Sequence, residues 1–223
     1  MLRLQDVFRR YRSGKVYIEA LRGVNFEIVP GDFAVIKGPS GSGKSTLLNI
    51  LGLLDAPNEG AVYLDGQAVS YDDFDALAVT RARLISFIFQ SFNLNPVLTL
   101  EENVMVPLMI RADIPKREKK ERVAEWIDKV GLSAHRSHRP DELSGGQRQR
   151  VAIARAMVTR PQVVIADEPT ANLDSTTTGS ILGLMQALNE EQKVAFVCAT
   201  HDPLLERYAR NIFLLHDGTL TAA

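Results

Sequence analysis

The stretch GPSGSGKS, residues 38–45, decides how this chain folds. It fits the pattern G-x-x-x-x-G-K-[ST], in which a glycine-rich loop joins a strand to a helix. The apolar run DFAVIKG (32–38) precedes it, and STLLNILGLL (45–54) follows with the apolar spacing of a helix. Glycines let consecutive backbone N–H groups converge on phosphate oxygens, and the helix N-terminus adds a favourable dipole. The sequence therefore predicts a loop that binds phosphate groups.

Two side chains of this loop suit a triphosphate and its metal ion. Lys44 can reach the β and γ phosphates, and the hydroxyl group of Ser45 can ligate Mg²⁺. A chance match is disfavoured because the loop has both the expected residue types and the expected strand and helix around it. We therefore expect a nucleoside triphosphate to bind here together with Mg²⁺.

A second apolar run, VVIADEPT (163–170), ends in two acidic residues. In an open α/β sheet, ligands bind beyond the carboxyl ends of the strands. Asp167 then suits the Mg²⁺ shell, and Glu168 suits polarising an attacking water molecule. The alternative is a pair of solvated loop acids, which the presence of the phosphate loop disfavours. His201 follows the run VAFVCAT (194–200), so we expect it at the same edge of the sheet, where a γ-phosphate could be sensed.

The order of the apolar runs indicates an α/β fold. Three runs at the start, with a Pro30-Gly31 turn between the last two, predict an antiparallel hairpin region: LRLQDVF (2–8), VNFEIV (24–29) and DFAVIKG (32–38). Further strands are expected at AVYLDG (61–66), LISFIF (84–89), QVVIAD (162–167), VAFVCAT (194–200) and NIFLLHDG (211–218). Uninterrupted apolar runs favour a mainly parallel sheet. We expect one domain, with an α/β core of 1–90 and 161–223 and an inserted helical subdomain of 91–160.

Composition narrows the class of protein. The chain has 223 residues, 45% apolar and 24% charged, which is typical of a globular domain. Its net charge of −1 gives no argument for a nucleic-acid partner. The single cysteine, Cys198, lies in an apolar run and is expected to be a core thiol in a reducing compartment. The N-terminus lacks the apolar stretch of a signal peptide, and no window reaches about 18 uninterrupted apolar residues. We expect a cytoplasmic domain.

The segment LSGGQRQR (143–150) places a serine and two glycines in front of what the spacing predicts to be a long helix. Glycine at such a position costs backbone entropy, so a compensating role is expected. The N-terminus of a helix is a ready anion site. The chain therefore has a second candidate phosphate-binding element besides residues 38–45.

Together these motifs resemble the ATP-binding subunit of ABC transporters over nearly the full chain. GPSGSGKST (38–46) is similar to Walker A, VVIADEPT to Walker B with Glu168 as the catalytic carboxylate, and LSGGQ (143–147) to the family signature. Gln90 is similar to the Q-loop glutamine that touches Mg²⁺ and the lytic water. Asp174 ends ANLD (171–174), which is similar to the D-loop, and His201 is similar to the switch histidine. Tyr11 matches the aromatic residue that stacks on adenine, with Tyr17 a weaker rival.

The resemblance implies a P-loop NTPase core of RecA-like type with an N-terminal antiparallel β subdomain. It also implies an ATPase with ATP and Mg²⁺ as ligands. The expected catalytic residues are Glu168, His201 and Gln90, and the expected Mg²⁺ ligands are Ser45, Gln90 and Asp167. The expected nucleotide-binding residues are Tyr11, Gly38, Pro39, Ser40, Gly41, Ser42, Gly43, Lys44, Ser45, Thr46, Ser144, Gly145, Gly146, Gln147 and Asp174.

The resemblance also implies two kinds of protein partner. In this family the signature residues Ser144, Gly145 and Gly146 contact the γ-phosphate held by a second chain, so an ATP-bound homodimer with a head-to-tail arrangement is expected. Separate transmembrane permease subunits are expected as well, because the sequence has no membrane-spanning run. The expected location is peripheral, on the cytoplasmic side of the inner (plasma) membrane. No nucleic acid is expected as a partner.

Within the family, two long segments look most like the lipoprotein-release, macrolide-efflux and cell-division group: LLNILGLLDAPNEGAVYLDGQ (47–67) and FIFQSFNLNPVLTLEENVMVPL (87–108). In that group, the membrane partners of the ATP-binding subunit perform work outside the cytoplasm. This work is export, lipoprotein release or transmission of mechanical force. We expect the partner to dock on residues 91–107. The expected contacts are Phe92, Leu94, Pro96 and Val97, whereas Val104 and Leu108 are expected in the core.

Other functions are weighed against this one. One alternative is an ABC-type ATPase that regulates cell division through a membrane partner. Another is a soluble ABC ATPase of DNA repair or translation, although such proteins usually carry a long coiled coil or two fused cassettes, for which this chain has no room. A P-loop GTPase is disfavoured because the guanine-reading motif needs an Asn-Lys pair, and the sequence has none.

Overall fold

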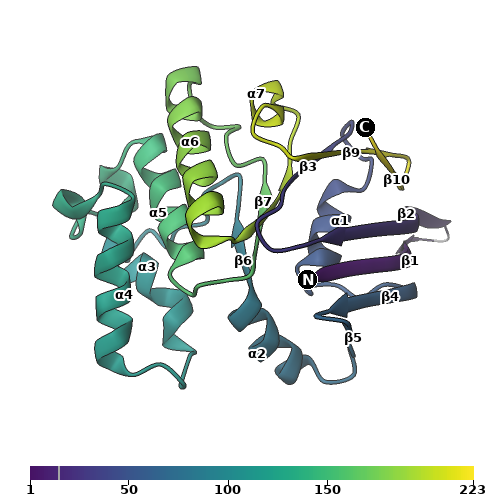
Figure 1. Cartoon of the computed structure of the whole chain (residues 1–223), viewed down its shortest axis with the longest axis horizontal. Helices are drawn as coiled ribbons and strands as arrows, with labels where there is room; N and C mark the ends of the chain where they lie inside the picture. The colour runs from purple at the N-terminus through teal and green to yellow at the C-terminus, as the bar shows by residue number, and fades with distance from the viewer. Residues whose placement is uncertain (15) are drawn as a thin grey trace.

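A six-stranded sheet forms the centre of the protein (Figure 1), and the computed structural model describes residues 1–14 and 16–223. The strand order is β10 (Thr219–Ala222), β9 (Asn211–His216), β3 (Phe33–Lys37), β8 (Ala195–Ala199), β7 (Val163–Asp167) and β6 (Ile85–Ile88). Five strands are parallel, and β10 pairs antiparallel with β9. The strands β3, β7 and β8 are buried on both faces, as a parallel sheet requires. The prediction of a mainly parallel sheet is confirmed.

A second sheet has four antiparallel strands in the order β2 (Val16–Ile28), β1 (Leu2–Ser13), β4 (Glu59–Leu64) and β5 (Gln67–Ala68). The predicted antiparallel hairpin region at the start of the chain is confirmed for β1 and β2, but no hairpin crosses Pro30-Gly31, because β3 enters the central sheet. The burial patterns explain this outcome. Strand β2 alternates between buried and exposed residues towards its end, which suits a sheet with one wet face, whereas β3 is apolar on both faces.

Two apolar clusters cover the two faces of the central sheet. In β3, Phe33 and Val35 pack into the first cluster with the helices of residues 91–160, while Ala34 and Ile36 pack into the second cluster. The second cluster also holds α1 (Lys44–Leu51) and the antiparallel sheet. Helix α1 thus lies between the two sheets, and its N-terminus is fixed where β3 ends.

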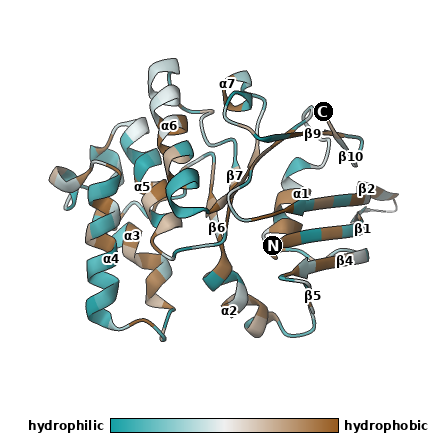
Figure 2. Cartoon of the chain, viewed as in Figure 1, coloured by the Kyte–Doolittle hydropathy of each residue, from teal (hydrophilic) through white to brown (hydrophobic). Residues whose placement is uncertain are grey.

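The remaining helices are α2 (Phe74–Leu84), α3 (Leu100–Met109), α4 (Lys116–Lys129), α5 (Gly145–Met157), α6 (Ser175–Gln192) and α7 (Pro203–Glu206), with short 3₁₀ turns at Ser133–His135 and Pro140–Glu142. Helices α3 to α5 confirm the helical character predicted for 91–160, whereas α2 and α6 were not predicted. Val104 and Leu108 of α3 are buried in the first cluster, as expected. Figure 2 shows β6 and β7 mostly apolar and α4 largely hydrophilic. In the described residues, no helix combines the length and the apolar character that a bilayer crossing needs.

Candidate active site

The loop of residues 38–45 joins β3 to α1 and can be built only with glycine at two positions. Gly43 caps α1 with φ of 105°, a left-handed conformation, and a Cβ atom there would lie 2.3 Å from the carbonyl oxygen of Ala20. At Gly38 a Cβ atom would lie 2.2 Å from the carbonyl oxygen of Leu215. The Nζ atom of Lys44 donates to the carbonyl oxygens of Gly38 and Pro39, at 2.7 and 3.0 Å. The loop therefore curls around the ammonium group at the N-terminus of α1, where an anion is favoured.

A cleft of about 670 Å³ brings the separate motifs together. It lies at the carboxyl ends of β3, β6, β7 and β8, which is where ligands bind in such sheets. Its lining includes Ile18, Glu19, Ala20, Gly38, Pro39, Ser40, Gly41, Gly43, Lys44, Ser45, Thr46, Gln90, Asp167, Glu168 and His201. Of the predicted loop residues only Ser42 is outside this lining, since its side chain is buried.

Two side-chain oxygens that could ligate a metal ion lie close together in the cleft. The Oγ atom of Ser45 donates to Oδ2 of Asp167 at 3.5 Å. Burial and the neighbouring Glu168 carboxylate raise the pKa of Asp167, while Lys44 and Ser45 oppose this shift. A cation between these oxygens would favour the ionised carboxylate. The donor set fits Mg²⁺, which binds through one or two protein oxygens together with phosphate and water oxygens. In the described residues, no group of three or more His, Cys, Asp or Glu side chains is arranged to hold a metal ion.

Glu168 is held on three sides. Its backbone has φ of 47°, and its N–H donates to the carbonyl oxygen of Ala199 at 2.9 Å. Its Oε1 atom lies 2.7 Å from Nδ1 of His201, and Oε2 accepts from Oγ1 of Thr200 at 3.0 Å. The Glu168 side chain is 14% exposed and that of His201 is 76% exposed, so the carboxylate lies inside and the imidazole lies at the rim. A carboxylate with fixed orientation in a partly dry cleft is suited to act as a general base.

Thr200 is a site residue that was not predicted from the sequence. It is fully buried, and its hydroxyl group also accepts from the N–H of Asp202 at 3.0 Å, which fixes the direction in which the hydroxyl donates to Glu168. A signal was available, because Thr200 is a polar residue at the end of a buried apolar run, directly before His201.

Gln90 follows β6 and lies at the cleft with an exposed side chain. Its backbone carbonyl oxygen accepts a hydrogen bond from Nδ2 of Asn172 at 2.7 Å. The loop after β6 and the loop after β7 are therefore joined within one chain, which brings the predicted Q-loop and D-loop segments side by side.

The predicted adenine contact has a different environment from the phosphate site. The hydroxyl group of Tyr11 donates to Oδ2 of Asp55 at 2.7 Å, and the guanidinium group of Arg9 lies 4.7 Å from its ring centre. Tyr11 does not line the cleft, and its role with adenine stays a prediction. Tyr17 is exposed and lines a separate depression. Ile18 of β2, an exposed apolar residue that the sequence analysis did not select, does line the cleft.

The signature residues lie outside the cleft. Ser144 caps α5, where its Oγ atom accepts from the N–H of Gln147 at 3.3 Å and its own N–H donates to Oε1 of Gln147 at 2.8 Å. The N–H groups of Gly145 and Gly146 have no intrahelical acceptor at this helix end. A Cβ atom at Gly146 would lie 2.5 Å from the Thr177 side chain. Such a helix end favours an anion, and none of these residues lines the cleft that holds the chain's own phosphate loop.

Asp174 has a capping role in the structure. Its Oδ1 atom accepts from the N–H groups of Thr176 and Thr177, and Oδ2 accepts from the hydroxyl group of Thr177 at 2.6 Å. These hydrogen bonds, chiefly those from Thr177, lower the pKa of Asp174. The ionised carboxylate fixes the start of α6 beside Gly146, and its contact with nucleotide stays a prediction.

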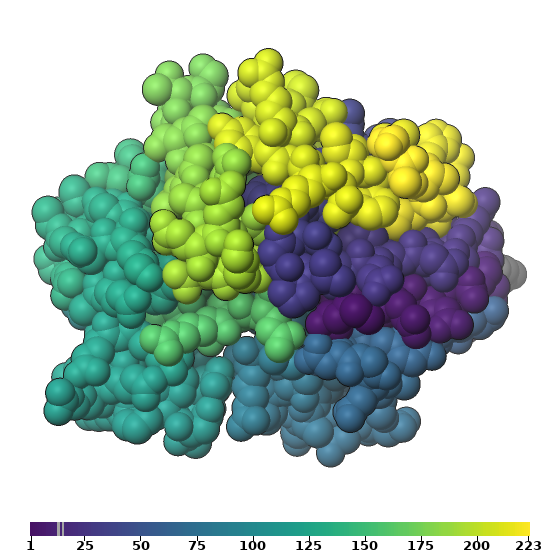
Figure 3. Space-filling view, in the orientation of Figure 1, coloured from purple at the N-terminus to yellow at the C-terminus, as the bar shows by residue number. Residues whose placement is uncertain are grey.

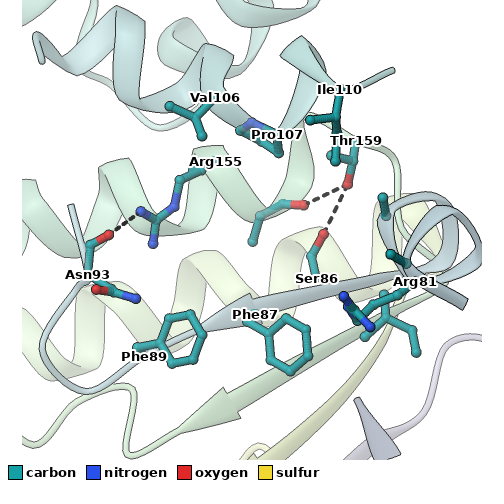
Figure 4. A pocket seen from close by; sticks show the side chains of 14 residues that line it. Arg81, Ser86, Phe87, Phe89, Asn93, Val106, Pro107, Ile110, Arg155 and Thr159 are labelled. Atoms are coloured by element: carbon teal, nitrogen blue, oxygen red, sulfur yellow. Dashed lines mark hydrogen bonds between the residues drawn. The ribbon is translucent and has the colours of Figure 1, made fainter. Parts of the chain in front are cut away.

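A second hollow lies between α2 and α3 (Figures 3 and 4). It has a volume of about 350 Å³ and is lined by Ala78, Arg81, Ala82, Ile85, Ser86, Phe87, Phe89, Asn93, Val106, Pro107, Ile110, Arg155, Ala156 and Thr159. None of the four predicted docking residues is in its lining, although Asn93, which lies between Phe92 and Leu94 in the sequence, is. Phe92 and Leu94 are half-buried, while Pro96 and Val97 are exposed. The apolar hollow, called the groove below, is therefore made from more of the chain than residues 91–107.

Three comparisons bear on this geometry. A family model described as "ABC transporter" matches residues 21–171. The lipoprotein-releasing system ATP-binding protein LolD of Acinetobacter baylyi is 43% identical over 98% of this chain and 96% of its own length. The macrolide export ATP-binding/permease protein MacB of Syntrophobacter fumaroxidans is 44% identical over 99% of this chain, which spans 31% of that protein. The ATP-binding cassette MJ0796, in a dimeric post-hydrolysis state bound to ADP and Pi, has a TM-score of 0.90 at 43% identity, covering 100% of this chain and 98% of that one.

Proposed function

The chain belongs to the ABC transporter family, and we propose that it is the ATP-binding subunit of a membrane complex that hydrolyses ATP as a head-to-tail dimer. The observation that carries this proposal is the division of the motifs. The phosphate loop, Gln90, Asp167, Glu168 and His201 share one cleft, whereas Ser144 and the adjoining glycines form a separate anion site. Two chains are needed to bring these two halves together.

Binding starts with the phosphate loop. The N–H groups at the start of α1 and the ammonium group of Lys44 attract the phosphates of ATP. Ser45 and Asp167 would hold Mg²⁺ with Gln90 close by, and the ion would neutralise charge on the β and γ phosphates. The half-buried setting strengthens each of these interactions relative to bulk water.

Hydrolysis then depends on Glu168. Its carboxylate, oriented by Thr200 and His201, accepts a hydrogen bond from a water molecule and polarises it for attack on the γ-phosphate. His201 is exposed enough to contact both that phosphate and an approaching partner chain. Glu168 lines the cleft with a left-handed backbone conformation.

The second chain completes the site. The N–H groups of Gly145 and Gly146, at the N-terminus of α5, would contact the γ-phosphate held by the partner's phosphate loop. The dimeric state of the similar cassette MJ0796 supports this arrangement. ATP acts as part of the interface, so the dimer forms with ATP and separates after hydrolysis.

We place the dimer at the cytoplasmic face of the membrane, bound to separate permease subunits. The names of the LolD and MacB relatives support this, since one belongs to a lipoprotein-releasing system and the other joins ATP binding to a permease. The groove offers the partner an apolar binding surface next to the segment that follows Gln90. ATP binding and hydrolysis would move the helical subdomain of residues 91–160, and this movement would be transmitted to the membrane partner.

A mixing experiment tests the dimer. A Ser144→Arg chain and a Lys44→Ala chain are each expected to be inactive, because every composite site in either homodimer carries a lesion. In a mixed dimer both lesions fall in one site and the other site is intact, so ATPase activity should reappear on mixing. Mixing two batches of Lys44→Ala is the control. Activity in the Ser144→Arg protein alone, equal to that of the unchanged protein, would contradict the assignment of the signature as a site element.

A further inference from the structure

One arginine of α5 makes hydrogen bonds to the segment that follows Gln90. The guanidinium group of Arg155 donates to the carbonyl oxygens of Phe92 and Asn93, at 2.7 and 2.5 Å. Figure 4 shows the side chain extending from α5 to the backbone at Asn93. Since Ser144 caps the N-terminus of α5, the same helix carries the signature at one end and fixes the Gln90 segment near the other.

The site of Arg155 is unusual for a charged side chain. The residue is half-buried, and burial lowers the pKa of its guanidinium group. In the part of the chain that the structure describes, no carboxylate pairs with it. The cost of burying the charge is therefore offset by carbonyl oxygens alone. A planar fork that donates to two successive carbonyl groups specifies backbone geometry, which a lysine at this position could not do.

The segment that Arg155 holds has a strained backbone. Phe92 and Asn93 both have positive φ, 60° and 51°, and a bulky residue such as phenylalanine rarely adopts this conformation. The guanidinium group of Arg148 adds a second contact from α5, at 5.2 Å from the Phe92 ring centre. Strained conformations persist only where surrounding groups determine them, and they are common at functional sites.

We propose that Arg155 is a positioning residue for Gln90. It fixes the carbonyl groups of Phe92 and Asn93, while Asn172 fixes the carbonyl group of Gln90 itself. The backbone of Gln90 is thereby held at one place at the cleft, which Asp167 and Glu168 also line. The inference rests on the proposed role of Gln90 at the Mg²⁺ and the attacking water. Arg155 does not line the nucleotide cleft, so it would act on the chemical step and not on ATP affinity.

The first experiment compares two arginines of α5 in the full chain. Arg150 is the matched control, because it is also half-buried and donates to the carbonyl oxygen of Val130 and to the hydroxyl group of Ser180, far from the Gln90 segment in the sequence. We expect Arg155→Lys to lower kcat at least about tenfold while KM for ATP changes by less than about twofold, since a small misplacement of a catalytic group is costly. Arg150→Lys should keep kcat, and both variants should have similar melting temperatures.

A double-mutant cycle with Gln90→Ala separates the possible failures. If Arg155 acts through Gln90, adding Arg155→Lys to Gln90→Ala should lower kcat little further. If the two substitutions lower kcat additively, the inference is overturned. It is also overturned if Gln90→Ala lowers kcat while Arg155→Lys leaves kcat normal. A Gln90→Ala variant with normal kcat would overturn the proposed role of Gln90, and the inference with it.

Discussion

His201 meets Glu168 at the ends of two neighbouring strands, with Nδ1 of the imidazole 2.7 Å from Oε1 of the carboxylate. The register of β7 and β8 creates this contact, because Asp167 lies opposite Ala199 and the following residues turn towards the same cleft. Thr200 binds the other carboxylate oxygen. The carboxylate is thus oriented by one buried and one exposed donor, and each can be removed separately.

Glu168→Gln should retain ATP binding and lose hydrolysis. An amide cannot polarise water as a carboxylate does, and loss of a general base typically costs about 10²–10⁴-fold in rate. The dimer should then persist with MgATP, and size-exclusion chromatography would measure it. Glu121→Gln, a change at an exposed ion pair with Arg117, is the control. A monomeric Glu168→Gln protein in MgATP, or one with the original hydrolysis rate, would contradict the role given to Glu168.

Thr200→Val should lower kcat by about tenfold, with little change in the affinity for ATP. Valine keeps the shape of the buried side chain but leaves Oε2 of Glu168 without this donor, and a lost hydrogen bond to a charged group is worth about 1.5–3 kcal/mol. Thr170→Val is the matched control, since its buried hydroxyl group donates to Asp202 and not to Glu168. Equal losses of kcat in both variants would indicate that the effect is only structural.

Two glycine substitutions should have opposite effects on stability. Gly43→Ala places a Cβ atom 2.3 Å from the carbonyl oxygen of Ala20 at positive φ, so it should lower the free energy of unfolding and abolish ATP binding. Gly183 is exposed in the middle of α6, with nothing within 4 Å of an added Cβ atom. Gly183→Ala should raise the free energy of unfolding by about 0.5–1 kcal/mol. Denaturant titrations of both variants measure the difference, and a stabilised Gly43→Ala protein would contradict the loop geometry.

The sequence predicted the elements whose chemistry depends on local residue order. The phosphate loop, the acidic end of β7 and the capped start of α5 are each defined within a few consecutive residues. Which strands pair when they are far apart in the sequence was harder to predict. The Pro30-Gly31 turn has the local sequence of a hairpin turn. However, β3 is apolar and buried on both faces, so it pairs within the central sheet, which is covered on both sides.

Contacts between loops could not be predicted, because they depend on how the two sheets and α5 are packed. The hydrogen bonds from Thr200 to Glu168 and from Arg155 to the Gln90 segment join residues far apart in the sequence. Helix α2 was missed because its apolar residues do not gather on one face, and only Leu77 of that helix is buried. The sequence did not predict the full extent of the groove, because six of its fourteen lining residues come from α2 and β6.

The last prediction concerns the groove as the surface proposed to meet a membrane partner. Ile110 is 73% exposed and lines the groove, and Phe92 and Leu94 lie beside it with partial burial. We expect Ile110→Asp to leave ATP binding by the isolated subunit nearly unchanged and to prevent assembly with the permease. A charge placed in an apolar contact typically costs a few kcal/mol.

Three variants distinguish the groove from its neighbouring segment. Ile110→Asp tests the groove, and Phe92→Asp tests the segment after Gln90, where Leu94 also packs against the helical core. Val29→Asp, at an exposed apolar residue between β2 and β3, is the control for a general effect of surface charge. Pull-down of the membrane subunits with each variant measures assembly. If Ile110→Asp prevents assembly and Val29→Asp does not, the result supports the groove as the docking surface. If only Phe92→Asp prevents assembly, the docking surface is at residues 91–97. If all three variants assemble normally, the docking surface lies elsewhere on the molecule.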